Sequence, residues 1–317
     1  MPEPALDRLL QETAKSLDIP PELIEEAVLR YEAVGVWLCD EGSTLKGCAP
    51  EIYPQGSFRL GTPVRPTRGE EFDIDLVCQL NLSKESISQD VLKESVGARL
   101  RQSEEFVRRL TPKRRCWTLK YGKKFHLDVL PAIPDQEVKK SSILITDTDL
   151  TRWQHSNPIG YANWFYARMG SLFEEAKRLF AQSAGQNVEE VPSWHVRTPL
   201  QRAVQLLKRH RDLRFSPDAE DRPTSIIITT LAAHAYRQQR DLYSALLHLS
   251  QYMPSYIENR QGSWWIANPA HPGENFADKW NEIPSRKDAF LAWLGTVQAD
   301  LAGAVALKND FFSGAFI

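Results

Sequence analysis

The sequence contains few cysteines, and their spacing fits no zinc site. Only four occur among 317 residues, with no Cys-x-x-Cys pair and no histidine beside them at metal-binding spacing. A disulfide framework and a zinc finger are therefore both unexpected. Long apolar runs are also missing, since the longest one, SIIITTLAAHAY, is too short to cross a bilayer. The N-terminus, MPEPALDRLLQET, is polar and acidic, unlike a signal peptide. We therefore expect a cytoplasmic protein without membrane attachment.

The sequence also lacks an excess of basic residues. Lys and Arg together number 39 against 41 Asp and Glu, which gives a formal net charge of -2. Proteins that bind long nucleic acids usually carry a clear basic excess. Neither DNA nor RNA is therefore expected as an obligatory partner, although local basic clusters could hold a small anion.

What the sequence does contain is enough apolar material for two domains, with 42% hydrophobic residues. The pattern predicts an N-terminal α/β unit over 1–152 and a mainly helical unit over 153–317. Expected elements of the first unit are helices over Pro20–Asp40 and Ser86–Arg109, a strand over Phe72–Leu80 and a hairpin around Gly122. Expected helices of the second unit are Ile159–Gln182, Pro199–Leu213, Thr224–Gln239, Ala245–Met253 and Ser285–Val305. The segment ENRQGSWWIANPAHPGENF is expected to be irregular.

Two carboxylates stand two positions apart in the predicted strand FDIDLVCQL. Successive side chains on a strand alternate between its faces, so Asp73 and Asp75 share one face. Their charges repel unless a cation lies between them, and hard divalent ions such as Mg²⁺ prefer oxygen ligands. An ordinary solvated strand face is the alternative, and Asp-x-Asp by itself does not exclude it.

A third carboxylate strengthens the metal interpretation. Asp128 lies on the polar phase of the predicted strand FHLDVLPAI, together with His126. Three carboxylates can hold a pair of ions that clamps the attacking and leaving oxygens of a phosphoryl displacement.

A glycine-serine pair precedes the first two carboxylates. Gly56 permits close approach of the backbone, and Ser57 offers a hydroxyl and an N–H to a phosphate oxygen. The same turn continues in Gly61-Thr62. Alone, this pattern would indicate only an ordinary glycine-rich turn.

The combined pattern resembles a known superfamily. Gly-Ser-x-x-x-Gly-Thr, then Asp-x-Asp, then a later strand Asp, is similar to the polymerase-β-like nucleotidyltransferases. The segments LQRAVQLLKRHRD, PTSIIITTLAAHAY and NPAHPGENFADKW resemble the cGAS/DncV-like nucleotidyltransferases (CD-NTases). The resemblance implies an α+β, bilobal fold. Its nucleotidyltransferase core would be followed by a mainly helical domain like that of the oligoadenylate synthases.

The same resemblance implies residue roles. Two Mg²⁺ ions, with Mn²⁺ as an alternative, would bind Asp73, Asp75 and Asp128, which form the expected catalytic set. Asp128 would be the base. The expected nucleotide-binding residues are Gln55, Gly56, Ser57, Lys208, Ser225 and Asn268. Of these, Lys208 and Ser225 would hold the donor triphosphate and Asn268 would touch a base, whereas Arg209 and Arg211 are expected on a solvated helix face. A turn-forming Asn before Pro is an equally good interpretation of Asn268.

The activity implied is the joining of ATP, GTP or both into a cyclic di- or trinucleotide messenger, with pyrophosphate released, in antiphage (CBASS) signalling. The chain would be a monomer, and its partners would be effector or regulatory proteins of a defence system. One alternative is a linear-product enzyme of the oligoadenylate synthase or RNA nucleotidyltransferase type. Another is an inactive nucleotide-binding module, against which the three retained carboxylates argue. Base order, linkage and ring size stay open.

Overall fold

The computed structural model describes residues 4–66, 71–138, 141–147, 153–185, 187–188, 191–192, 195–215 and 220–314. The chain divides into two compact units. The α/β unit comprises Ile19–Trp164 and Pro269–Glu274, and the helical unit comprises Met1–Asp18, Phe165–Asn268 and Asn275–Ile317. Each unit is described by itself.

This division differs from the expected boundary between residues 152 and 153. The first helix, α1 (Pro4–Ser16), belongs to the helical unit. The Asp7 carboxylate explains why, because it accepts hydrogen bonds from the backbone N–H groups of Leu242 and Tyr243, at 2.6 and 3.1 Å. These groups open helix α10 (Leu242–Tyr252) and have no partner within it, so an acidic side chain stabilises them. The sequence pattern carries no signal for this long-range cap, so the predicted boundary did not take it into account.

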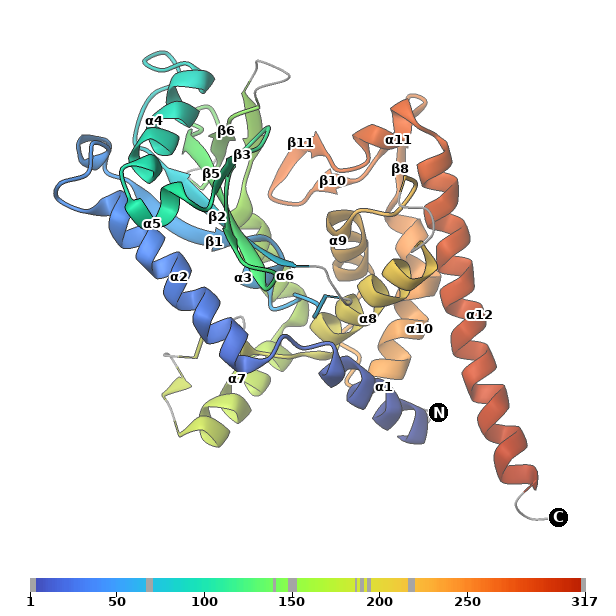
Figure 1. Cartoon of the computed structure of the whole chain (residues 1–317). Helices are drawn as coiled ribbons and strands as arrows, with labels where there is room; N and C mark the ends of the chain where they lie inside the picture. Colours follow the sequence, from blue (N-terminus) through green and yellow to red (C-terminus); the bar gives the residue numbers. More distant parts are fainter. Residues whose placement is uncertain are drawn as a thin grey trace. The chain divides into compact units, whose positions relative to one another are not determined.

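The described part of the α/β unit contains a seven-stranded sheet (Figure 1). Its strands are β1 (Glu51–Gln55), β2 (Phe72–Gln79), β3 (Leu110–Pro112), β4 (Trp117–Tyr121), β5 (Phe125–Pro134), β6 (Ile143–Ile145) and β7 (Gln154–Ser156). The order is β1-β2-β5-β4-β3, with β6 pairing β5 and β7 pairing β6. Strands β2 and β5 run parallel, and the other paired strands run antiparallel.

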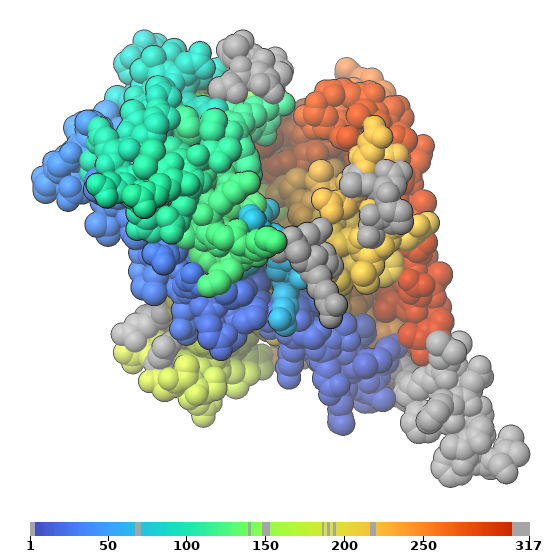
Figure 2. Space-filling model, in the orientation of Figure 1, coloured from blue at the N-terminus to red at the C-terminus, as the bar shows by residue number. Residues whose placement is uncertain are grey.

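The helices of this unit are α2 (Pro21–Cys39), η1 (Lys46–Cys48), α3 (Gly56–Leu60), α4 (Gln89–Arg101), α5 (Glu104–Val107) and the start of α6 (Pro158–Met169). Residues of α4 and α5, teal in Figure 2, form part of the unit's surface. The single helix expected over Ser86–Arg109 is two helices, because Ser103 accepts a hydrogen bond from the N–H of Phe106 and begins α5.

Helix α4 covers one face of the sheet and leaves the other for the polar side chains. The indole of Trp117 donates to the carbonyl of Lys93 in α4, and it lies so close to Gly97 that a Cβ there would overlap its ring. Trp117 is the register partner of Val129 on β5. Because cross-strand partners share a face, Val129 points towards α4, and its neighbour Asp128 points away. The side chains of β5 therefore alternate between the two faces, as the sequence predicted.

The helical unit contains α1, α7 (Ser171–Ala184), α8 (Pro199–Arg214), α9 (Ser225–Ala235), α10 (Leu242–Tyr252), η4 (Met253–Tyr256), α11 (Asp278–Glu282) and α12 (Ser285–Gly314). Thr198 and Gln201 form a reciprocal capping box at the start of α8. The single helix expected over Ile159–Gln182 is broken at Gly170, whose φ of 55° is left-handed and ends α6.

The segment expected to be irregular before α11 contains short strands instead. They are β8 (Glu258–Arg260), β9 (Ser263–Trp265), β10 (Ala267–Asn268) and β11 (His271–Asn275). Strands of two to five residues, interrupted by Gly and Pro, leave too short a pattern for sequence periodicity to detect. In the described residues, each helix is too short or too polar to serve as a membrane span.

Candidate active site

Four side chains form one row across the sheet of the α/β unit. Asp75 on β2 is the register partner of Gln55 on β1 and of Asp128 on β5, and Asp128 is in turn the partner of Thr118 on β4. Register partners share a face, so the row Gln55–Asp75–Asp128–Thr118 points away from α4. One step along the same face, Asp73 pairs with His126. The sheet therefore brings together the three predicted carboxylates.

The glycine-serine turn meets this row at its centre. Gly56 has a φ of 63°, and a Cβ on it would lie 2.5 Å from Asp75 Oδ2. The backbone of Gly56 is thus in close contact with the carboxylate, and any other side chain would displace one or the other. Ser57 follows in the first turn of α3, where its carbonyl accepts the N–H of Thr62. The structure thus places Gln55 and Gly56 against Asp75, with Ser57 next to Gly56 in the chain, and their binding of a nucleotide stays a prediction.

Burial and like charge make Asp75 an unusual carboxyl group. Burial, together with the neighbouring carboxylates of Asp128 and Asp73, raises its pKa to about 7, even though the ammonium of Lys113 offsets part of the shift. A divalent cation among these oxygens would remove the repulsion. The donor set consists of carboxylate oxygens, so the residues present fit the hard Mg²⁺ or Mn²⁺ ions that the sequence predicts.

Two further side chains, to which the sequence analysis assigned no role, contact the carboxylates. Lys113, directly after β3, places its Nζ 3.2 Å from Asp128 Oδ2. His126 places Nε2 3.1 Å from Asp73 Oδ1 and Nδ1 3.2 Å from Glu71 Oε2. His126 could have been found from its phase on the predicted strand, because it shares the polar face with Asp128. Lys113 carried no such signal, since the contact depends on how β3 pairs.

Thr118 is a third residue that the sequence did not single out. Its hydroxyl donates a hydrogen bond to Asp128 Oδ1. The Thr118 side chain is fully buried, so this bond fixes the orientation of the carboxylate. Asp128 therefore presents its Oδ2 towards Lys113 and the open side of the face.

Two of the residues predicted to hold the triphosphate, Lys208 and Ser225, lie in the helical unit. Lys208, on α8, is buried, and burial together with the nearby charge of Arg211 lowers its pKa to about 7. Arg211 donates to the hydroxyl of Ser225 at the start of α9, at 2.9 Å, and to the carbonyl of Pro223. The expectation that Arg211 lies on a solvated face is therefore wrong: its side chain links α8 to the start of α9. Arg209 is only partly exposed.

Asn268 is also in the helical unit, at the end of β10, where it is 3% exposed. Its contact with a base stays a prediction. Because Lys208, Ser225 and Asn268 belong to a different unit from the carboxylates, their joint use in one nucleotide site stays a prediction as well.

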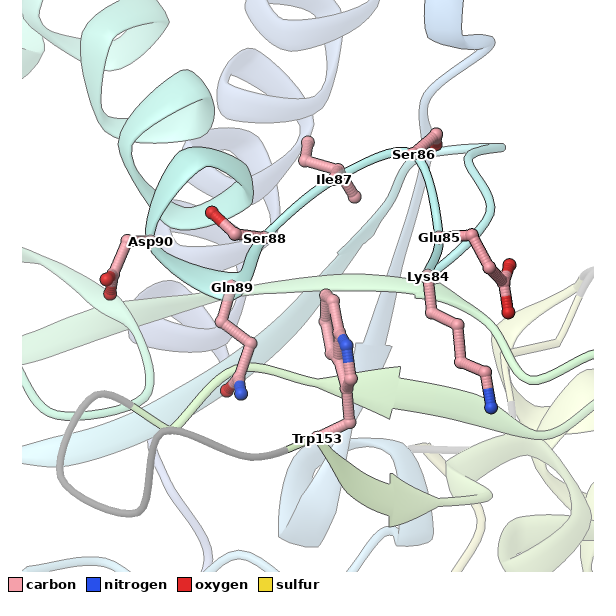
Figure 3. A pocket seen from close by; sticks show the side chains of 8 residues that line it. All are labelled: Lys84, Glu85, Ser86, Ile87, Ser88, Gln89, Asp90 and Trp153. Carbon is pink, nitrogen blue, oxygen red and sulfur yellow. The ribbon is translucent and has the colours of Figure 1, made fainter.

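A separate cavity of about 680 Å³ lies at the start of α4. It is lined by Lys84, Glu85, Ser86, Ile87, Ser88, Gln89, Asp90 and Trp153, and the Trp153 indole projects between Gln89 and Lys84 (Figure 3). Its lining includes none of the three carboxylates, so it is not the predicted catalytic site. The Gln89 carboxamide is engaged in the fold, accepting the N–H of Asp147 at 2.8 Å.

Comparisons with known proteins agree with this geometry. Residues 6–168 match the family described as the Second Messenger Oligonucleotide or Dinucleotide Synthetase domain (SMODS). A c-di-GMP synthase of Roseivirga ehrenbergii is 32% identical over 88% of this chain and 75% of its own length. The cyclic dinucleotide synthase CdnG of Bradyrhizobium diazoefficiens is 28% identical over 94% of this chain and 76% of its own length.

The solved structure of that CdnG in complex with GTP superposes with a TM-score of 0.78 at 26% identity. The match covers 97% of this chain and 94% of that one. The fold is thus that of the polymerase-β-like nucleotidyltransferases, and the protein is an enzyme of that class. Within the class, the chain belongs to the SMODS family, the CD-NTases.

Proposed function

We propose that this chain is a Mg²⁺-dependent cyclic dinucleotide synthase that uses GTP, ATP or both. The observation that carries the proposal is the row of Asp75 and Asp128 on parallel strands, with Asp73 beside them and Gly56 against Asp75. The preference for purines is supported by the relatives, since one is named a c-di-GMP synthase and another was solved with GTP.

Asp73, Asp75 and Asp128 would hold the metal ions. Two bound Mg²⁺ ions would neutralise the triphosphate and lower the pKa of the attacking ribose hydroxyl. The close approach of Gly56 to Asp75 allows the backbone of this turn to lie against a phosphate, and Ser57 offers a hydroxyl to a phosphate oxygen. Thr118 keeps Asp128 oriented to accept the proton of the hydroxyl.

In each transfer the ribose oxygen of the acceptor forms a bond to the α-phosphorus of the donor. The bond from that phosphorus to the bridging oxygen breaks, and pyrophosphate leaves. A second transfer within the linear intermediate closes the ring. Lys208 and Ser225 would hold the donor triphosphate. The near-neutral charge of the chain favours synthesis without long nucleic acid. Family membership supports antiphage signalling as the biological role.

The test is incubation with Mg²⁺ and each NTP, alone and in pairs, followed by phosphatase treatment and mass spectrometry. A phosphatase-resistant cyclic product from GTP, or from GTP with ATP, is expected. A ladder of phosphatase-sensitive linear products would assign the chain to the linear-product type. If no NTP is turned over with either Mg²⁺ or Mn²⁺, the chain would instead be an inactive nucleotide-binding module.

A further inference from the structure

A second cluster of ligating side chains lies in the α/β unit, apart from the carboxylate row in the sequence. Asp135 follows β5, His155 is the central residue of β7, and His271 opens β11. The backbone of Asp135 donates to Ser142 O, and His155 is the register partner of Leu144 on the intervening strand β6. Because Ser142 and Leu144 are two positions apart, their side chains share a face, and Asp135 and His155 lie on that same face.

The third member reaches the cluster through the segment Pro269–Glu274, which the chain contributes to the α/β unit from a distant part of the sequence. Asn157 anchors this segment. Its side-chain amide donates to Ala270 O at 3.3 Å and to Ser142 Oγ at 3.2 Å. The imidazole of His271 then stacks on that of His155, with ring centroids 5.1 Å apart and planes at 19°.

The polar atoms of the three side chains converge. One ligating atom from each residue lies within 4.8 Å of the other two. His155 Nδ1 is 2.6 Å from Asp135 Oδ2, and the Asp135 side chain is 1% exposed. His271 Nδ1 is shielded from solvent and, within the described residues, has no hydrogen-bond partner. An ion pair between Asp135 and His155 would account for the positions of those two side chains. It would not account for the buried Nδ1 of His271.

We propose that Asp135, His155 and His271 bind a transition-metal ion, with Zn²⁺ as the ion that best suits the ligands. Two imidazole nitrogens and one carboxylate oxygen form a donor set used by zinc when one position is left to water. The His155 side chain is 43% exposed, which leaves a side of the cluster accessible for that water. Mg²⁺ is a poor candidate because it prefers oxygen ligands and octahedral geometry.

The bound ion would fasten Pro269–Glu274 to the end of β5 and to the edge strand β7. It would supplement the hydrogen bond from Asn157 to Ala270. The residue before this segment is Asn268, so the ion would also restrain the backbone next to a residue predicted to contact a base. The role is structural, and it does not depend on the catalytic assignment.

The experiment uses the full chain without a histidine tag, kept in excess Mg²⁺ so that oxygen-only sites are saturated. The protein, freed of transition metals, is titrated with Co²⁺, whose visible absorption reports imidazole ligation, and with Zn²⁺ in competition with a chelating dye. One ion per chain is expected, together with a rise in Tm on Zn²⁺ addition. In His271→Gln the Zn²⁺ affinity should fall at least tenfold and the Tm rise should be lost. Asp73→Asn/Asp75→Asn should bind Zn²⁺ as the wild type does.

His210→Gln is the matched control. His210 also pairs with a carboxylate, 2.9 Å from Asp300 Oδ2, but its Nδ1 already accepts a hydrogen bond from the Trp293 indole. It should retain the wild-type Co²⁺ spectrum. The proposal is overturned if the wild type gives no imidazole-type Co²⁺ spectrum, or if His271→Gln binds Zn²⁺ as tightly as His210→Gln. The wild-type titration decides the matter even if His271→Gln fails to fold.

Discussion

Asp75 and Asp128 are register partners on two parallel strands, and the charge of Asp128 adds to burial in raising the pKa of Asp75 to about 7. The fold thus holds two carboxylates together where, without a cation, one of them resists ionisation. A bound cation would relieve this repulsion, so the catalytic role proposed for these residues and their effect on stability can be tested separately.

Asp75→Asn should abolish nucleotide transfer and, in metal-free protein, increase stability. A carboxyl whose folded pKa is raised, here from 3.8 to about 7, stabilises the fold only below the lower value, and that contribution is lost as the pH rises to the higher one. The gain from Asn should therefore grow between about pH 4 and pH 7 and stay level above. We expect the gain at pH 8 to exceed that at pH 5 by about 2 kcal/mol in urea unfolding.

Asp73→Asn provides the comparison, because the Asp73 side chain is 61% exposed. It should lose activity without a comparable gain in stability. Near wild-type turnover in Asp75→Asn with Mg²⁺ would contradict the two-ion interpretation.

Gly56→Ala should remove most activity, since its Cβ would lie 2.5 Å from Asp75 Oδ2. The left-handed φ of Gly56 adds backbone strain of roughly 1–2 kcal/mol. Gly122→Ala is a matched control, because Gly122 also has a left-handed φ, of 66°, and a Cβ there meets nothing within 4 Å. Both variants should lose similar stability from strain, as measured by Tm, but only Gly56→Ala should lose turnover. Equal activity in the two would refute the close contact.

Lys113→Ala should lower the Mg²⁺ concentration needed for half-maximal activity. The ammonium of Lys113, 3.2 Å from Asp128 Oδ2, competes with a cation for that carboxylate. The pair is partly exposed, so the effect should be at most about fivefold, the equivalent of roughly 1 kcal/mol. Lys124→Ala, which removes an ion pair with Glu26 in the same unit, should leave the Mg²⁺ dependence unchanged. A higher Mg²⁺ requirement in Lys113→Ala would show that Lys113 assists metal binding.

Lys208→Ala should reduce kcat/KM for the donor about ten- to hundredfold, as the loss of a charge-assisted contact worth roughly 1.5–3 kcal/mol implies. Arg214→Ala, at the exposed end of the same helix, should change it little. Burial lowers the pKa of Lys208 to about 7, so the free enzyme loses this positive charge as the pH rises above 7. The KM of the wild type for the donor should rise over that range, and the rise should be absent from Lys208→Ala. Parallel pH profiles in both proteins would remove Lys208 from the donor site.

Much of the carboxylate row could be predicted from the sequence because it depends on local periodicity. Alternation along FDIDLVCQL and FHLDVLPAI determines the face of each Asp, and a Gly next to Ser marks the turn that approaches them. Neither pattern contains the register between strands. Lys113 and Thr118 were therefore missed, because each meets Asp128 only through strand pairing.

The helical unit shows the same limit. Apolar spacing predicted α8, but the position of Arg211 depends on Pro223 and on Ser225 at the start of α9, which accept its hydrogen bonds. The cluster of Asp135, His155 and His271 is harder still to predict from the sequence. Its members come from three different strands or strand ends, and most of the helical unit separates the last from the others in the sequence.

The parallel pairing of β2 and β5 has a consequence for biosynthesis. Parallel neighbours need a long connection, and here α4, α5, β3 and β4 intervene between the two strands. Asp73 and Asp75 leave the ribosome well before Asp128, and until β5 emerges they have no third carboxylate beside them. A nascent or truncated chain that ends before β5 therefore lacks the third carboxylate of the proposed metal site, however well its first strands have folded. Unfinished copies of the enzyme would therefore not synthesise a signalling nucleotide.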